Sequence, residues 1–319
     1  MPELLRAATR PYRTPIVDSA RWNEYTPRPD DIIVATYPKC GTTWTQRIVD
    51  LLIHQSAEPR PIMKTYPWLD ATFFDPLDEV LQRLDTQIHR RSIKSHLPFD
   101  SLPLFDRVKY IHVVRDGRDA CFSMHNHQLG FTDAAKQRIA AANPDLRRGN
   151  GGPPPPIPED PRAYFLGWIG EAEAWRDGET PGLPFFEFEM TYWRERTLLN
   201  LLLVHYNDLK ADLAGEMRRI SQFLDIETPE EVLAELVRAA RFESMQNDGS
   251  ALLVDIDTFF DRGHKRFLNK GTNGRWKDVL SDEDLARYDA LVKERLSPGA
   301  AAWIEHGRHG AGDPRALAD

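Results

Sequence analysis

Cysteine and long apolar runs are both scarce in this chain of 319 residues. The two cysteines, Cys40 and Cys121, are too few for a disulfide framework, and neither lies in a spacing typical of metal sites. No stretch approaches the roughly 18 consecutive apolar residues of a membrane span. The opening segment MPELLRAATRPYRTP lacks the apolar core of a signal peptide. These absences predict a cytoplasmic protein without a bound metal or a membrane anchor.

An excess of positive charge is also missing. The formal net charge is −8 and the isoelectric point is about 5.7. An acidic chain is a poor candidate for non-specific nucleic-acid binding, so an anionic ligand must be held by a local cluster of cations and backbone N–H groups. What the chain has is apolar material, because 41% hydrophobic residues are enough to form a large core.

Apolar runs alternate with segments of helical spacing along the chain. Expected strands lie at 32–36, 91–95, 108–114 and 200–205, with a weak one near 185–188. Expected helices lie at 42–55, 117–128, 163–176, 209–224, 230–239, 242–247 and 282–295. This alternation predicts an α/β fold, in which helices flank a central parallel sheet and ligands bind beyond the carboxyl ends of the strands. We expect residues 1–319 to form one domain.

Two segments interrupt this alternation. Residues 143–161, NPDLRRGNGGPPPPIPEDP, are too rich in proline and glycine for a helix or a strand. Such a segment is either an exposed linker or a lid over an acceptor pocket, because long loops in compact domains are often functional. The tail at 298–319 is expected to be loosely held.

The stretch TYPKCGTTW joins the first expected strand to the first expected helix. It differs from the nucleotide-triphosphate loop, because Thr36 stands where that loop has glycine and Lys39 precedes Gly41. Gly41 permits a tight turn, while Thr42 and Thr43 open the helix with unpaired N–H groups. This combination predicts an anion site with a lysine beside it.

Arg115 follows the strand at 108–114, and Ser123 lies further along the next helix. A guanidinium and a hydroxyl in these places are suited to a phosphate. The alternative is a structural arginine that pairs with Asp116 or Asp119.

Lys94 and His96 are two positions apart at the end of an expected strand, so their side chains face the same way. A lysine discourages protonation of a nearby imidazole, which can then accept a proton from a hydroxyl. The alternative is a histidine that only satisfies a buried backbone group.

The stretch NKGTNGRWK, residues 269–277, combines two glycines with Lys270, Arg275 and Lys277. Such a loop can close over an anion, or it can be a solvated basic turn. Tyr206 follows the strand at 200–205 and can reach a base or a ribose. His125 and His127 are two apart on a helix and diverge, which argues against a shared metal.

In their order and spacing these stretches resemble the cytosolic sulfotransferase family, which uses 3′-phosphoadenosine 5′-phosphosulfate (PAPS). TYPKCGTTW resembles the family's 5′-phosphosulfate loop, and VVRDGRDACFS resembles its 3′-phosphate segment. IKSHLP is similar to the catalytic stretch, and KGTNGRWK to the C-terminal loop. The resemblance runs from about Asp31 to Asp289.

The resemblance implies in-line transfer of a sulfuryl group to a hydroxyl of a small molecule, leaving adenosine 3′,5′-bisphosphate (PAP). It implies that His96 is the general base, while Lys39 and Lys94 stabilise charge on the moving group and the leaving oxygen. It also implies a set of donor-binding residues: Lys39, Cys40, Gly41, Thr42 and Thr43 at the 5′ end; Trp44, Tyr206 and Phe242 at the adenine; Arg115, Ser123, Asn269, Lys270 and Gly271 at the 3′-phosphate.

Some positions depart from the family's pattern. Cys40 stands where serine is usual, which is either a redox feature or a swap of small residues. Asn269 stands where arginine is common, and Arg266 is a candidate to replace that contact in part. The dimer motif of many animal members is not matched, so the oligomeric state is left open.

Several alternatives remain at this point. They are a P-loop kinase, a nucleotide-binding module without catalysis, and a glycan or protein sulfotransferase. The acceptor is expected to be hydrophobic or aromatic, because aromatic residues are frequent in 62–89, 131–161 and 252–264. The sequence does not separate a phenol from a steroid, a lipid alcohol or an amine.

Overall fold

The computed structural model describes residues 1–142, 156–176 and 182–319. Most of the proline- and glycine-rich segment at 143–161, with the lid considered for it, therefore lies outside the described residues.

A four-stranded parallel sheet forms the centre of the molecule. Its strands are β2 (Ile32–Ala35), β3 (Ser92–Ser95), β5 (Lys109–Val114) and β6 (Leu201–His205). Their order is β3-β2-β5-β6, and Ile33 of β2 lies opposite both Ile93 and Tyr110. The predicted α/β architecture and four of the expected strands are confirmed.

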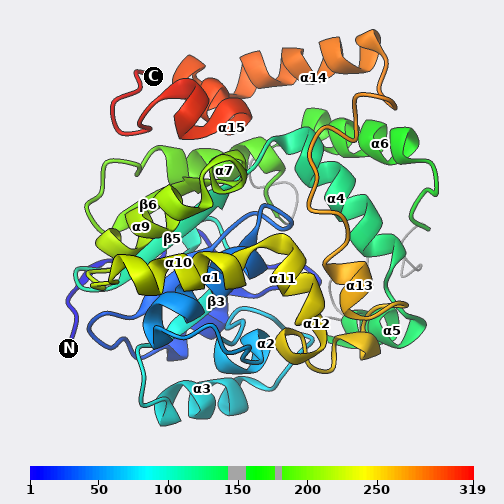
Figure 1. Cartoon of the computed structure of the whole chain (residues 1–319). Coiled ribbons are helices and arrows are strands. Elements are labelled where there is room, and N and C mark those ends of the chain that lie inside the picture. Colours follow the sequence, from blue (N-terminus) through cyan, green and yellow to red (C-terminus); the bar gives the residue numbers. More distant parts are fainter. Residues whose placement is uncertain (143–155, 177–181) are drawn as a thin grey trace.

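Helices cover both faces of the sheet (Figure 1). On one face lie α1 (Thr42–His54), α9 (Leu213–Phe223) and α10 (Glu230–Ala240). The other face is covered by α4 (Gly117–Leu129), α6 (Pro161–Ala174), α7 (Phe185–Trp193), α14 (Asp282–Arg295) and α15 (Pro298–Ala311). Other helices are α2 (Ile62–Thr65), α3 (Leu77–Thr86), α5 (Asp133–Ala142), α8 (Tyr206–Ala211), α11 (Phe242–Asn247), α12 (Gly249–Leu252) and α13 (His264–Phe267).

Side chains that alternate along the strands divide the core into two layers. Ile32 and Val34 pack with α1, α9 and α10, whereas Ile33 and Ala35 pack on the opposite face. This is the two-residue period of a strand that is buried on both sides. A third apolar cluster contains Tyr66, Phe73, Met245, Phe259 and Phe260.

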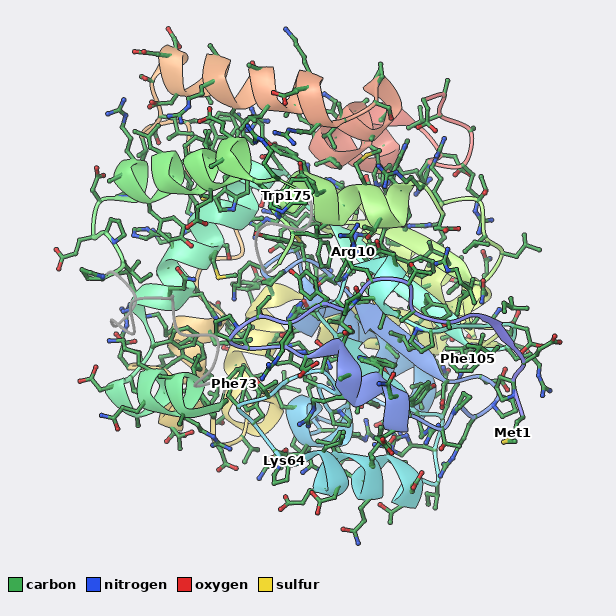
Figure 2. The ribbon with its side chains drawn as sticks, turned by 180° about the vertical axis from the view of Figure 1, so that it is seen from behind. Met1, Arg10, Lys64, Phe73, Phe105 and Trp175 are labelled. Atoms are coloured by element: carbon green, nitrogen blue, oxygen red, sulfur yellow. The ribbon has the colours of Figure 1, made fainter. Side chains whose placement is uncertain are left out.

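The N-terminal segment crosses the back of the molecule from Met1 to Arg10 (Figure 2). Within it, β1 (Leu4–Arg6) pairs antiparallel with β4 (Leu104–Phe105). The Thr9 and Arg10 N–H groups donate to the carbonyl oxygen of Asp100 at 2.8 and 3.1 Å. The segment is therefore tied to the chain that follows β3. No helix among residues 1–142, 156–176 and 182–319 is long and apolar enough to span a membrane.

The weak strand expected near 185–188 is wrong, because Phe185–Trp193 form helix α7. Alternating aromatic and acidic residues favour a strand locally. In the fold, however, Phe185, Phe186 and Phe188 are all buried, and Glu189 lies 2.7 Å from Nε2 of buried His112. A helix that is buried nearly all round lacks the amphipathic pattern by which sequence reasoning recognises helices.

The C-terminal half differs from the expectation in two places. The expected helix at 209–224 is divided at Asp212, whose carboxylate accepts from the Gly215 N–H at 2.8 Å and so caps α9. The tail at 298–319 was expected to be loosely held, but it begins with helix α15, on which Trp303 and Ile304 are buried. Their apolar surface packs into the core, which secures this helix to the sheet.

Candidate active site

The predicted site residues follow the carboxyl ends of the strands. The loop at 36–41 continues β2, His96 follows β3, Arg115 follows β5 and Tyr206 follows β6. Because parallel strands end at one edge of the sheet, these segments meet there.

The loop between β2 and α1 is shaped to receive an anion. Lys39 has φ 72° and Gly41 has φ 119°, so two left-handed residues fold the chain tightly around Cys40. Helix α1 begins at Thr42, and no side chain in the described part of the chain caps its N-terminus. The first N–H groups of α1 and the helix dipole therefore favour negative charge at this point.

Glycine at position 41 is favoured by packing as well as by its φ angle. A Cβ there would lie 3.0 Å from Cδ2 of Tyr206. The Thr42 hydroxyl lies 2.6 Å from the Thr36 hydroxyl, which fixes the start of the helix against the end of β2. The loop and Tyr206 therefore form one packed unit.

His96 is held in the tautomer that a base requires. Its Nδ1–H donates to the carbonyl oxygen of Thr36 at 2.7 Å, which leaves the lone pair on Nε2. Burial, together with the charge of Lys94, holds the pKa of His96 well below its usual value. The imidazole is therefore neutral near pH 7 and can accept a proton at Nε2.

Asp70 organises the surroundings of His96. Its Oδ2 accepts from the His96 backbone N–H at 3.0 Å and from Nε1 of Trp68 at 2.7 Å, while its Oδ1 accepts from Nε1 of Trp22 at 3.2 Å. Burial raises the pKa of Asp70. Sequence reasoning missed this residue, although an aspartate among the aromatic residues at 66–74 was a visible signal.

Two lysines whose pKa values are lowered, Lys39 and Lys94, lie near His96. The Lys39 ammonium donates to Nδ1 of His127 at 3.2 Å and lies 4.7 Å from the centre of the Phe267 ring. Burial, with the charges of Lys94 and other cations, lowers the pKa of Lys39 to about 7. Burial lowers the pKa of Lys94 to about 8, and its ammonium lies 3.9 Å from the centre of the Trp68 ring.

His125 and His127 diverge, as the helical spacing predicts. His125 donates to the carbonyl oxygen of Pro158 at 2.7 Å, whereas His127 contacts Lys39. Sequence reasoning considered His127 only as a metal ligand and missed its contact with the lysine. Within the described ranges, no group of three or more His, Cys, Asp or Glu residues is placed to hold a metal ion.

Arg115 is joined to the C-terminal loop rather than to its neighbouring carboxylates. Its Nε and Nη2 donate to Oδ1 of Asn273 at 3.1 and 2.6 Å. Asp116 is bound by Arg118, and the Asp119 carboxylate accepts from the Gly274 N–H at 2.7 Å. The loop at 269–277 is thus fastened to the end of β5, which a solvated turn would not be.

Aromatic rings gather on the other side of the loop. Trp44 donates from Nε1 to the carbonyl oxygen of Ala240 at 2.7 Å, and its ring centre lies 5.3 Å from that of Tyr206. A Cβ on Gly271 would lie 2.9 Å from the ring of Phe242. The structure therefore brings Trp44 and Tyr206 together, and places Phe242 against the loop that carries Gly271.

For the other residues predicted to bind the donor, fewer contacts define their positions. Ser123 lies on α4 and is half-buried, while Lys270 is exposed. The Asn269 carbonyl accepts from Gln246 at 2.8 Å. Cys40 is buried, and burial raises the pKa of its thiol, which disfavours the thiolate that a redox role needs.

Most of the aromatic residues expected around an acceptor lie near His96 and Lys39. The Trp68 ring centre is 4.7 Å from that of His96 and 5.7 Å from those of Phe73 and Phe74. Near Lys39, the ring centres of Phe131 and Phe260 lie 5.0 and 4.7 Å from that of His127. Tyr66 is instead a core residue, fully buried with its hydroxyl 2.8 Å from Oδ1 of Asp50.

Comparison with known proteins decides the family. The sulfotransferase domain family matches residues 29–299. A glycolipid sulfotransferase of Mycobacterium tuberculosis is 33% identical over 315 residues, covering 94% of this chain and 95% of the relative. The chain belongs to the sulfotransferase family. It is a sulfotransferase that depends on PAPS, and the kinase and non-catalytic alternatives are set aside.

Other sulfotransferases and their structures agree. Sulfotransferase 1A1 of Rattus norvegicus is 28% identical, covering 86% of this chain and 87% of the relative. A crystal structure of retinol dehydratase in complex with androsterone and PAP matches with a TM-score of 0.65 at 24% identity, covering 87% of this chain and 83% of that one. Mouse sulfotransferase 7A1 with PAP matches with a TM-score of 0.63 at 20% identity, covering 88% and 89%. These matches confirm the fold.

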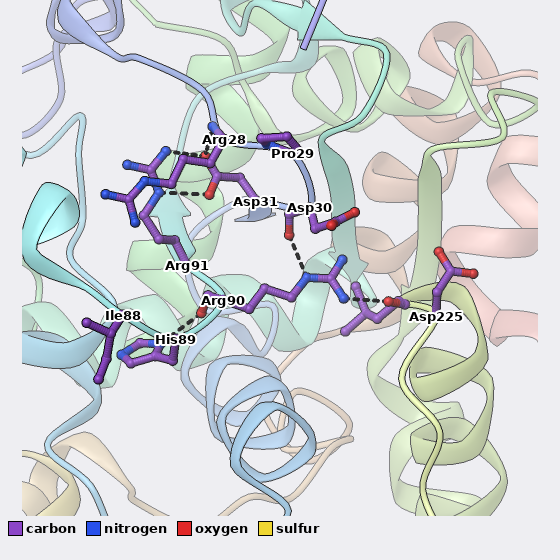
Figure 3. Close-up of a pocket in the computed structure, with 10 residues that line it drawn as sticks. Arg28, Pro29, Asp30, Asp31, Ile88, His89, Arg90, Arg91 and Asp225 are labelled. Carbon is purple, nitrogen blue, oxygen red and sulfur yellow. Dashed lines mark hydrogen bonds and ion pairs between the residues drawn. The ribbon is translucent and has the colours of Figure 1, made fainter. Parts of the chain in front are cut away.

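A cavity of about 390 Å³ lies at the amino ends of the strands, where β2 and β3 begin and away from the carboxyl ends that carry the candidate site (Figure 3). The arginines that line it are engaged within the protein. Arg90 donates to the carbonyl oxygens of Asp30 and Leu224, and Arg91 is paired with buried Asp31. These arginines fasten the amino ends of the strands, so the cavity is separate from the candidate active site.

Proposed function

We propose that this sulfotransferase moves the sulfuryl group of PAPS to a hydroxyl of a hydrophobic small molecule, with His96 as the general base. The geometry of His96 carries the proposal. A histidine that only satisfied a backbone carbonyl would not need a neutral Nε2 beside two lysines, whereas a base at this position would.

The donor would lie along the carboxyl edge of the sheet. We place its 5′-phosphosulfate over the loop at 39–43, where the first N–H groups of α1 and the Lys39 ammonium meet. We place its adenine against Trp44, Tyr206 and Phe242. The 3′-phosphate would then reach Arg115, Ser123 and the loop that carries Asn269, Lys270 and Gly271.

Transfer would proceed in line, as in phosphoryl transfer. The acceptor oxygen forms a bond to sulfur while the bond between sulfur and the bridging oxygen of the 5′-phosphate breaks. The acceptor's proton passes to Nε2 of His96, and the negative charge that develops on the leaving oxygen is stabilised by Lys39. Lys94 would stabilise charge on the sulfuryl group.

A hydrophobic alcohol or a phenol fits the surroundings of His96. The rings of Trp68, Phe73, Phe74 and Phe259 form one connected group beside it. One relative is named a glycolipid sulfotransferase, and one structural neighbour holds androsterone. Both names agree with an apolar acceptor that carries a hydroxyl group.

Two broader features belong to the same proposal. A cytoplasmic location is supported by the two free, buried cysteines. A single domain is supported by a core cluster that contains residues as far apart as Tyr12 and Ile304.

The substitution His96→Asn tests the assignment of the base. Its side-chain amide can still donate to the Thr36 carbonyl from the position of Nδ1, but it has no counterpart of Nε2. We expect transfer from PAPS to a panel of phenols and hydrophobic alcohols to fall at least about a hundredfold. PAP affinity should stay near that of the wild-type protein. Full transfer activity in the variant would refute the role of His96.

A further inference from the structure

Arg275 is a half-buried cation with no hydrogen-bond or ion-pair partner among the residues that the structure describes. Its Nε is buried without a hydrogen-bond partner, and no ion pair of its guanidinium occurs within the described ranges. Burial lowers the pKa of Arg275, and the nearby charge of Arg115 adds to this effect. A guanidinium that is partly removed from water normally has a carboxylate, a carbonyl or a phosphate to bind.

The residues on both sides of Arg275 fix its position near the donor site. Asn273 is bound by Arg115, and the Gly274 N–H donates to Asp119 at 2.7 Å. After Arg275, the ring of Trp276 lies 4.2 Å from the guanidinium of Arg118. The backbone is therefore held before and after Arg275 against the segment that begins at the end of β5.

One other basic candidate at this end of the nucleotide, suggested above to replace in part an arginine contact where Asn269 stands, is already engaged within the protein. Arg266 was the suggested replacement, but its Nε and Nη2 donate to the Asp261 carboxylate at 2.8 and 2.6 Å. Its Nη1 donates to Asn126 at 3.2 Å. Arg266 is thus committed elsewhere, whereas Arg275 is not.

We propose that Arg275 binds the 3′-phosphate of the donor together with Arg115, and so contributes to the preference for nucleotides that carry this group. The inference rests on the proposed donor site and adds a specificity-determining residue to it. A phosphate oxygen can accept from the planar fork of an arginine, and two arginines can share one phosphate. The bound phosphate would supply the partner that Arg275 lacks among the described residues of the free protein.

Calorimetric titrations with PAP and with adenosine 5′-monophosphate, which lacks the 3′-phosphate, test the inference. The variants are Arg275→Gln, Arg275→Lys and the matched control Arg266→Gln. Arg275→Gln should weaken PAP binding about ten- to a hundredfold, the effect of a hydrogen bond to a charged group, and leave the monophosphate unchanged. Arg275→Lys, which keeps the charge, should recover part of the lost affinity. Arg266→Gln should change neither ligand by more than about twofold.

Each result has a definite meaning. Equal losses for both ligands would show that Arg275 does not read the 3′-phosphate, and unchanged PAP affinity would show that it does not contact the nucleotide; either overturns the inference. Failure of the wild-type protein to bind PAP would instead count against the proposed function. If Arg275→Gln fails to fold, the Arg275→Lys titration still tests the inference. Lysine keeps the charge but lacks the planar guanidinium, so this variant should bind PAP more weakly than the wild-type protein and leave the affinity for the monophosphate unchanged.

Discussion

At the scale of single residues, the proposed donor site is marked by positive charges that repel one another in the free protein. Burial and the charges of Lys94, Arg115 and Arg275 lower the pKa of Lys39 to about 7. Burial lowers the pKa of Lys94 to about 8, although Asp70 opposes the change. A bound anion would relieve this repulsion, so part of the free energy of nucleotide binding would come from charges already gathered in the site.

PAP affinity is therefore expected to fall as pH rises above about 7, the pKa of Lys39 in the free protein. A bound phosphate favours the ammonium and raises this pKa. Below pH 7 Lys39 is already protonated in the free protein, and PAP affinity is at its maximum. Between the pKa of Lys39 in the free protein and its higher pKa in the complex, binding of PAP takes up a proton. The logarithm of affinity should then decrease by up to about one per pH unit. The phosphates titrate near pH 6, so the charge of the ligand is nearly constant above pH 7.

Calorimetry between pH 7 and 9, in buffers with different ionisation enthalpies, measures both the affinity and the proton uptake. The variant Lys39→Met should bind more weakly and show a flatter dependence on pH. A wild-type affinity that increases with pH would contradict this account of Lys39.

The candidate site residues predicted from the sequence lie in short local motifs, whereas the residues that were missed contact them from distant parts of the chain. Lys39 and His96 lie in short motifs whose neighbours in the sequence supply much of the chemistry. Asp70 acts on a residue 26 positions away, and His127 contacts one 88 positions away. Such contacts depend on how the strands and helices pack, so no local pattern reveals them.

At the scale of elements, the parallel strands were predictable because each is an apolar run followed by a motif. Helix α7 was not, because its aromatic residues are buried nearly all round and favour a strand in isolation. Helix α15 was missed because alanine, glycine and histidine give little apolar pattern. On this helix, the Arg308 guanidinium nevertheless donates to buried Glu216 at 2.7 Å. The backbone N–H of Arg308 donates to buried Asp208, also at 2.7 Å.

Helix α15 should therefore contribute to stability. Trp303 is 1% exposed, so Trp303→Ala removes a large side chain from the core and should lower the free energy of unfolding by about 3–5 kcal/mol. His306→Ala is the matched control, because the side chain of His306 is 56% exposed on the same helix. Urea unfolding measures both. Equal and small effects would show that α15 does not belong to the core.

At the scale of the whole molecule, the proposed donor site forms only when distant segments meet at one edge of the sheet. The loop after β2, Arg115, Tyr206, Phe242 and the loop at 269–277 come from five parts of the chain. A ligand that binds all of them binds the folded state alone. At a concentration one hundred times its dissociation constant, such a ligand stabilises the fold by about 2.7 kcal/mol.

The most direct test is thermal unfolding of the wild-type protein with PAP in the presence of EDTA, compared with ATP and Mg²⁺. We expect a clear rise in unfolding temperature with PAP alone, because the proposed donor site places one phosphate at the loop at 36–41 and the other at Arg115. This loop lacks the lysine that follows glycine in triphosphate loops. A rise only with ATP and Mg²⁺ would contradict the proposed donor site.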